Sequence, residues 1–203
     1  RRRDLAYTRR LKSSGFPESK SLESYDFSFP EKIDARLVRE LATLGFLKAS
    51  ETVWIAGASG TGKTHIANAL GMRALAEGYS VLYRHMSVIA RDLNASIADH
   101  TEERRLRFYE RQELLIVEDL GFADTPHESM SLVFELFNRR YERRSIVLTT
   151  NLVFADWNTV FPNAACATAL IDRLTHHAEI VRIEGESYRV REAELAEQGR
   201  RRG

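Results

Sequence analysis

Three glycines, a lysine and a threonine stand between an apolar run and a helix-like run in the stretch WIAGASGTGKTHIANAL, residues 54–70. The spacing is Gly57-x-x-x-x-Gly62-Lys63-Thr64. Backbone N–H groups converge on one phosphate only where the chain curls tightly, which glycine permits. The helix that follows presents its unpaired N–H groups and the positive end of its dipole to the anion. The stretch therefore predicts a strand, a phosphate-binding loop and a helix, in that order.

The charged and hydroxyl side chains of this loop indicate a nucleoside triphosphate with its metal ion. Lys63 carries a full charge on a stem long enough to reach the β- and γ-phosphates, and the Thr64 hydroxyl is a ligand suited to Mg²⁺. A random chain of this length meets the pattern about one time in a hundred. The alternative, a glycine-rich surface turn, is the weaker interpretation because the flanking strand and helix also match. The predicted nucleotide-binding residues are Gly57, Ala58, Ser59, Gly60, Thr61, Gly62, Lys63, Thr64 and His65.

Short apolar runs alternate with helix-like segments along the rest of the chain. The runs cover residues 52–57, 80–85, 113–119, 145–151 and 178–185, and the helix-like segments cover 63–77, 87–98, 101–112, 128–141 and 166–177. Continuous apolar runs separated by helices predict a parallel sheet that is covered on both faces. Residues 34–47 also have leucines and a valine close to helical spacing.

Two adjacent carboxylates, Glu118 and Asp119, end the third apolar run. In a nucleoside triphosphatase the first holds Mg²⁺ and the second polarises the attacking water. Successive side chains of a strand point to opposite faces, so the two roles require irregular backbone at 118–120. The alternative is an ordinary transition from strand to loop, which the phosphate loop disfavours.

Three further polar residues are candidates for the same site. Asn151 ends the fourth apolar run, where it can orient water or touch the γ-phosphate, or simply form a turn. Arg173 lies on an amphipathic segment, where it either pairs with a nearby acid or solvent, or reaches the γ-phosphate of a neighbouring subunit. Arg189 can approach the phosphates from the C-terminal side.

Composition sets broad limits on the class of protein. The chain has 203 residues and a formal net charge of +1, so bulk charge does not indicate a nucleic-acid partner. Its single cysteine, Cys166, allows no internal disulfide and is typical of a reducing compartment. No apolar stretch approaches the length of a membrane span.

We predict a basic lead-in over 1–30, a nucleotide-binding core over 31–192 and a basic tail over 193–203. The basic ends are either solvated tails or polyanion-binding segments.

Several stretches together resemble one family. They are FPESKSLESYDFSF, GASGTGKTHIANALG, LLIVEDLG, FNRRYERRSIVLTTN, FADWNTVF and ALIDRLTHHAEIVRIEGESYR, and they extend over nearly the whole chain. In these the chain resembles the IstB-type helper ATPases of bacterial insertion sequences, relatives of the DnaC helicase loader and the DnaA initiator in the AAA+ class. The resemblance implies an α/β P-loop NTPase core of three layers, with a five-stranded parallel sheet between helices.

The resemblance also assigns roles to residues. It implies ATP on the loop, with the adenine near residues 16–27, and Mg²⁺ held by Thr64 and Glu118. Asp119 stands in the catalytic position, Asn151 in that of a polar sensor, Arg173 in that of a finger given to a neighbour, and Arg189 in that of a second sensor. The order Glu-Asp departs from the family's usual Asp-Asp or Asp-Glu. Because a displacement of about 1 Å can cost 10²-fold in rate, we expect hydrolysis to be slow.

The implied activity is ATP hydrolysis by a bacterial, cytoplasmic protein that assists DNA transposition. Such proteins assemble as homo-oligomers on double-stranded DNA with ATP at the subunit interfaces, and they stimulate or target a transposase. Three alternatives stay open: a DnaC-like helicase loader, a nucleotide-gated DNA clamp with little turnover, and a small-molecule P-loop kinase. The kinase is disfavoured because the chain has no obvious cluster for a phosphate acceptor.

The resemblance places DNA contacts after the second apolar run, over residues 87–113. This segment contains Arg91, Arg104, Arg105, Arg107 and Arg111. Arg104, Arg107 and Arg111 share one face of a helix. Glutamates are interleaved with these arginines, so the alternative is a helix whose charged face is simply solvated.

Two adjacent histidines, His176 and His177, stand elsewhere in the chain. Because neighbouring side chains diverge on a helix, we expect the pair to form a poor metal site.

Overall fold

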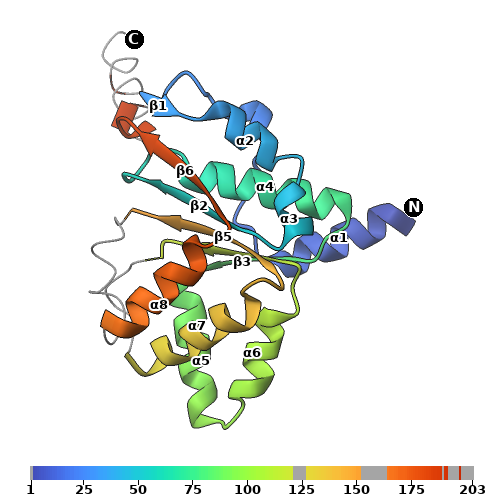
Figure 1. Cartoon of the computed structure of the whole chain (residues 1–203). Helices are drawn as coiled ribbons and strands as arrows, with labels where there is room; N and C mark the ends of the chain where they lie inside the picture. The colour runs from blue at the N-terminus through green and yellow to red at the C-terminus, as the bar shows by residue number, and fades with distance from the viewer. Residues whose placement is uncertain (1, 121–126, 152–163, 189, 192–196, 198–203) are drawn as a thin grey trace.

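The computed structural model describes residues 2–120, 127–151, 164–188, 190, 191 and 197 (Figure 1). Within these residues, six strands form one sheet in the order β1-β6-β2-β5-β4-β3. The strands are β1 (Lys32–Ile33), β2 (Thr52–Gly57), β3 (Val81–His85), β4 (Leu114–Glu118), β5 (Ser145–Thr150) and β6 (Ala178–Glu184). Strands β2 to β6 are parallel, and β1 pairs with β6 in the antiparallel direction. The carboxyl ends of β2, β4 and β5 therefore meet at one edge, where ligands of such sheets bind.

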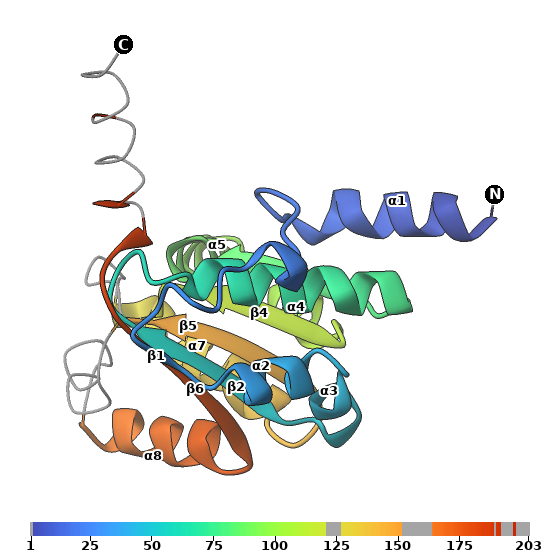
Figure 2. The same ribbon diagram turned by 90° about the horizontal axis from the view of Figure 1, so that it is seen from above.

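Helices cover both faces of this sheet (Figure 1). One layer contains α1 (Arg2–Ser14), α2 (Ala35–Leu41), α3 (Gly45–Ala49) and α4 (Lys63–Glu77), together with the short 3₁₀ helix η1 (Leu22–Ser24). The other layer contains α5 (Met86–Ala98), α6 (Glu102–Glu110), α7 (His127–Arg140) and α8 (Ala164–Thr175). Figure 2 shows α1 projecting from the body of the molecule toward the N-terminus.

Side chains of a strand alternate between the two faces of the sheet, so each layer of helices packs against the sheet through its own hydrophobic core. On β2, Val53 and Ile55 pack toward α4, whereas Trp54 packs toward α7 and α8. All three side chains are fully buried. The Trp54 indole Nε1 donates a hydrogen bond of 2.7 Å to the Leu174 carbonyl, which ties the central strand to the end of α8.

The predicted three-layer α/β fold is confirmed, with one additional strand and one broken helix. The five predicted parallel strands are present, but the expected count of five omits β1, whose two residues pair with Ile183 and Glu184. A strand of two residues is too short to produce a periodic pattern. The helical spacing over 34–47 belongs to two helices, because Leu44 adopts a left-handed conformation (φ 64°) between α2 and α3.

The lead-in ahead of β1 packs onto the α4 side of the sheet. Phe16, Tyr25 and Phe27 are partly buried against that core. Asn68 of α4 accepts a hydrogen bond of 3.2 Å from the Lys20 N–H and donates one of 2.8 Å to the Glu18 carbonyl. The lead-in is thus fixed beside the helix that follows the phosphate loop. In the parts of the chain described, no helix has both the length and the apolar character needed to cross a bilayer.

Candidate nucleotide-binding site

The loop between β2 and α4 curls as its glycines predict. Gly60 and Gly62 have positive φ angles of 81° and 95°, and Gly62 directly precedes the first residue of α4. At Gly57 a Cβ atom would stand 2.4 Å from the Ile183 carbonyl oxygen of β6. Glycine is therefore required at the first position by close packing and at the other two by backbone conformation.

Lys63 lies inside this loop, with 6% of its surface exposed. Its Nζ donates a hydrogen bond of 2.7 Å to the Ala58 carbonyl. The Thr61 hydroxyl donates one of 2.9 Å to the same oxygen. The ammonium group is thus held beneath the backbone N–H groups of the loop, where it can meet an anion that the loop encloses.

Thr64 and Glu118 meet at the carboxyl edge of the sheet. The Thr64 hydroxyl donates a hydrogen bond to Oε1 of Glu118, which ends β4. A hydroxyl and a carboxylate are the hard oxygen ligands that Mg²⁺ prefers, usually together with waters and substrate phosphates. These two side chains therefore fit a magnesium ion beside the phosphate loop.

Asp119 departs from the strand immediately after Glu118. Its φ of 54° is left-handed, so the two neighbouring carboxylates are not restricted to opposite faces of a regular strand. Its backbone N–H donates a hydrogen bond of 3.0 Å to the Thr149 hydroxyl of β5. Its Oδ2 lies 3.1 Å from Nε2 of His85, whose Nδ1 lies 2.9 Å from the Ser87 hydroxyl.

His85 is a site residue that the sequence analysis missed. It ends β3 and stands opposite Glu118 in the register of β3 and β4. The only sequence signal was a histidine at the end of the second apolar run. That signal becomes informative once β3 and β4 are known to be neighbours.

Lys63, Thr64, Glu118 and Asp119 line one cavity of about 420 Å³, and His85 contacts it through Asp119. The lead-in contributes Tyr25, Asp26 and Phe29 to its wall, and the segment after β6 contributes Tyr188. The Tyr25 hydroxyl donates a hydrogen bond of 3.3 Å to the Thr61 carbonyl. Burial, followed by the charge of Asp26, raises the pKa of Tyr25 to about 12, so this phenol remains a neutral donor.

The segment after β6 contacts the phosphate loop as well. The Tyr188 N–H donates a hydrogen bond of 3.0 Å to the Gly60 carbonyl, so both the lead-in and this C-terminal segment are bonded to the loop.

Comparison with known proteins places these features in a family. The family model described as IstB-like ATP binding protein matches residues 1–196. The chain belongs to this family. It is 42% identical over 187 residues to an insertion sequence IS21 protein of Pseudomonas aeruginosa that is named for ATP binding, covering 92% of this chain and 71% of that one. A relative from insertion sequence IS5376 of Geobacillus stearothermophilus, also named for ATP binding, is 35% identical and covers 93% of this chain and 75% of its own.

Solved structures resemble this IstB-like chain in fold. DnaI matches with a TM-score of 0.66 at 18% identity, covering 81% of this chain and 90% of that one. A replication initiator DnaA bound to AMPPCP and single-stranded DNA matches with a TM-score of 0.68 at 23% identity, covering 82% and 50%. The DnaC helicase loader matches with a TM-score of 0.61 at 16% identity, covering 87% and 99%. At these identities the likeness establishes the three-layer α/β fold alone.

The structure brings together most of the residues that the sequence predicts for the site. The cavity is lined by Ser59, Gly60, Thr61, Gly62, Lys63, Thr64, His65, Glu118 and Asp119. Gly57 and Ala58 form the base of the loop beneath them. His65 Nε2 lies 2.8 Å from the Ser21 carbonyl, so this side chain also contacts the lead-in.

Two other predicted site residues, Asn151 and Arg173, do not line this cavity. Asn151 follows β5, is exposed and is not part of the cavity wall. Arg173 of α8 donates a hydrogen bond to the Asn138 side chain of α7 and lies 5.9 Å from the centre of the Phe134 ring. Arg189 lies outside the described residues. Cys166 lies on α8, and its side chain is outside the described part of the structure.

The predicted DNA-contacting arginines divide into two groups. Arg104, Arg105, Arg107 and Arg111 line a separate groove of about 560 Å³ along α6. Within it, Arg105 pairs with Asp92 at 3.3 Å and Arg107 with Glu103 at 2.6 Å. Arg91 lies on α5 instead, where its Nε donates a hydrogen bond of 3.3 Å to the Ser87 carbonyl of its own helix.

Proposed function

We propose that this IstB-like protein binds and hydrolyses ATP and uses it to assist DNA transposition. The observation that carries the proposal is the convergence, in one cavity, of a phosphate loop with a buried lysine, a hydroxyl–carboxylate pair and a second carboxylate on irregular backbone. ATP bound there with Mg²⁺ would supply the reactive γ-phosphate. Family membership and relatives from insertion sequences support the connection to transposition.

The residues of the site have distinct proposed parts. The loop amides from Ser59 to Thr64 and the Lys63 ammonium hold the phosphates. Thr64 and Glu118 hold Mg²⁺. Asp119 accepts a proton from the attacking water, with His85 orienting its carboxylate. Asn151 and Arg173, which do not line the cavity, would contribute when the chain assembles, and Arg189, outside the described residues, would act as the second sensor.

The proposed partners are double-stranded DNA, further copies of this chain and a transposase. The arginine groove on α6 is the proposed DNA surface, and its contacts to phosphate would position the protein without reading sequence. Growth in particle size with ATP and DNA together, and not with either alone, would support assembly on DNA. Pulldown of a transposase rather than a replicative helicase would separate the helper from a helicase loader.

The nucleotide site is tested by Lys63→Ala. Without the ammonium group, we expect the variant to lose detectable ATP binding or turnover. Binding is measured with a fluorescent ATP analogue, and turnover by phosphate release with and without DNA. Lys48→Ala, at an exposed lysine of α3, is the matched control and should behave like the parent. Normal turnover in Lys63→Ala would refute the site. ATP binding by the parent without DNA-stimulated phosphate release would instead indicate a nucleotide-gated clamp.

A further inference from the structure

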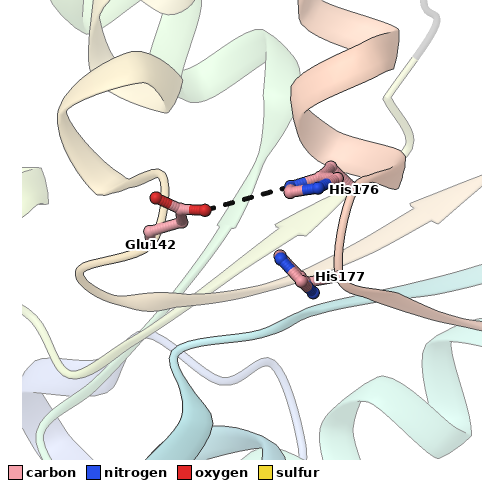
Figure 3. A group of neighbouring side chains, drawn as sticks. All are labelled: Glu142, His176 and His177. Atoms are coloured by element: carbon pink, nitrogen blue, oxygen red, sulfur yellow. Dashed lines mark ion pairs between the residues drawn. The ribbon is translucent and has the colours of Figure 1, made fainter.

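Figure 3 shows the neighbouring side chains of two histidines and a glutamate. They lie before the first residues of β5 and β6, at the end of the parallel sheet opposite the phosphate loop. Each of Glu142, His176 and His177 offers one ligand atom, and these atoms all lie within 4.8 Å of one another. His176 and His177 immediately precede β6, and Glu142 lies shortly before β5. The phosphate loop follows the other end of β2, about 20 Å away at the usual 3.3 Å per strand residue. This cluster is therefore separate from the nucleotide site.

Left-handed backbone explains why the two adjacent histidines converge. The His176 N–H still donates to the Asp172 carbonyl as the last turn of α8 closes. His177 then takes a φ of 53°, which ends the helix and turns its ring back, so that the two imidazole centres are 3.9 Å apart. The prediction that they diverge was wrong because it assumed that both belong to the helix.

Glu142 reaches the same point from the end of α7. It too has a left-handed conformation, with a φ of 55°. Its Oε1 lies 3.9 Å from Nδ1 of His176, the pair joined by the dashed line in Figure 3. The Tyr141 hydroxyl lies 2.7 Å from the same nitrogen, so a metal ion bound at Nδ1 would replace this hydrogen bond. The cluster borders a cavity of about 300 Å³ that Ser50, Glu51 and Thr52 also line.

We propose that Glu142, His176 and His177 form a binding site for Zn²⁺. Two imidazoles and one carboxylate suit Zn²⁺, whereas Mg²⁺ prefers oxygen ligands alone. Zn²⁺ sites with three protein ligands leave the fourth position to water. Zn²⁺–ligand bonds of about 2.0–2.2 Å in a tetrahedral site place the ligand atoms roughly 3.3 Å from one another. The three ligand atoms already lie within 4.8 Å of one another on exposed side chains, so small side-chain rotations would bring them to this separation.

The bound ion would connect two segments that are distant in sequence. Glu142 follows α7 and the histidines follow α8, so the metal would fasten the ends of these two helices together. It would also close the cavity in front of Ser50 and Thr52, at the start of β2. The site would therefore stabilise the folded chain without taking part in chemistry at the phosphate loop.

Zn²⁺ titration of untagged, nucleotide-free protein tests this proposal. The protein is treated with EDTA, exchanged into EDTA-free buffer and titrated with ZnCl₂ by calorimetry. The parent should bind one equivalent more than the double variant His176→Ala/His177→Ala, and Glu142→Gln should bind more weakly than the parent. His100→Ala, at an exposed histidine after α5, is the matched control and should keep the full stoichiometry. Equal stoichiometry and affinity in the parent and the double variant would overturn the site, leaving only a surface ion pair.

Thermal unfolding gives a second readout that does not depend on ATP. A ligand that binds only the folded state raises the Tm. Zn²⁺ should therefore raise the Tm of the parent and of His100→Ala, with no rise for the double variant. In EDTA all three should unfold at similar temperatures, because the replaced side chains are exposed. An equal Zn²⁺-dependent rise in all three would refute the site, whatever the outcome of the ATPase experiments.

Discussion

Asp119 is held by its neighbours at both the side chain and the backbone. His85 contacts its carboxylate at 3.1 Å and the Thr149 hydroxyl accepts from its N–H at 3.0 Å. We expect Asp119→Asn to lower kcat for ATP by about 10²–10⁴, the usual contribution of a general base, with ATP binding nearly unchanged. Phosphate release and nucleotide titration measure the two quantities. Asp26→Asn, at a carboxylate in the wall of the same cavity, should leave kcat close to that of the parent, and an equal loss in both variants would argue against a specific role for Asp119.

Arg140 is a fully buried cation in the middle of the fold. Its guanidinium donates to the carbonyls of Tyr109, Glu110, Gln112 and Ser145 at 2.6–3.0 Å, joining the end of α6 to the start of β5. Burial lowers the pKa of Arg140 to about 9, so it stays charged at neutral pH.

Replacing this side chain tests the stability of that junction. Arg140→Met leaves four carbonyls without their donor, and because each buried acceptor left unsatisfied costs about 1–3 kcal/mol, we expect the free energy of unfolding to fall by at least about 3 kcal/mol. Arg139→Met is the matched control at the neighbouring, more exposed position, where the ion pairs to Glu103, Glu110 and Glu135 should contribute about 1 kcal/mol or less. Urea denaturation measures both. A similar loss of unfolding free energy in the two variants would show that the buried hydrogen bonds of Arg140 stabilise the fold no more than the exposed ion pairs of Arg139 do.

At the scale of elements, the α6 segment presents Arg104, Arg107 and Arg111 to a groove, whereas Arg105 also pairs with Asp92 of α5. Arg104 and Arg111 lie exposed in that groove, and Arg111 lies 5.3 Å from the centre of the Phe108 ring. If the groove binds DNA, Arg104→Ala/Arg111→Ala should weaken affinity for duplexes of any sequence and reduce the salt slope by about 1 for each DNA phosphate that is no longer neutralised. Fluorescence anisotropy over a range of salt concentrations measures this. Arg36→Ala, at an exposed arginine of α2, is the control, and an unchanged slope in the double variant would exclude the groove.

Elements built from local patterns were predictable, whereas contacts between them were not. The apolar runs located β2 to β6, and the conflict between adjacent carboxylates indicated the irregular backbone at Asp119. His85 was missed because its proximity to Asp119 depends on the pairing of β3 with β4. The burial of Arg140 was missed because neighbouring arginines are ordinarily solvated. His176 and His177 were misjudged because a single left-handed residue, which sequence patterns rarely reveal in a non-glycine position, decides whether they meet.

At the scale of the whole molecule, the proposed role of Arg173 depends on assembly of several copies of the chain. Within one subunit it contacts Asn138 and does not line the nucleotide cavity. If it serves a neighbouring subunit's γ-phosphate, Arg173→Ala should bind ATP nearly as the parent does but lose turnover by about 10³-fold or more. If Arg173 only joins α8 to α7, then Asn138→Ala, which removes its intramolecular partner, should cause a similar loss. We expect Asn138→Ala to retain turnover.

Mixing variants distinguishes a shared site from a damaged subunit. Lys63→Ala keeps Arg173 but has no nucleotide site, and Arg173→Ala keeps the site but has no arginine to donate. In a mixed assembly some interfaces combine an intact loop with an intact arginine, so phosphate release should recover partially with DNA present and should be greatest near equal amounts. Mixing Lys63→Ala with Asp119→Asn is the control. Both changes lie in the same cavity, so no subunit of this mixture has a cavity with both Lys63 and Asp119 intact, and phosphate release should not recover. The absence of recovery at every ratio of Lys63→Ala to Arg173→Ala would count against an arginine acting between subunits.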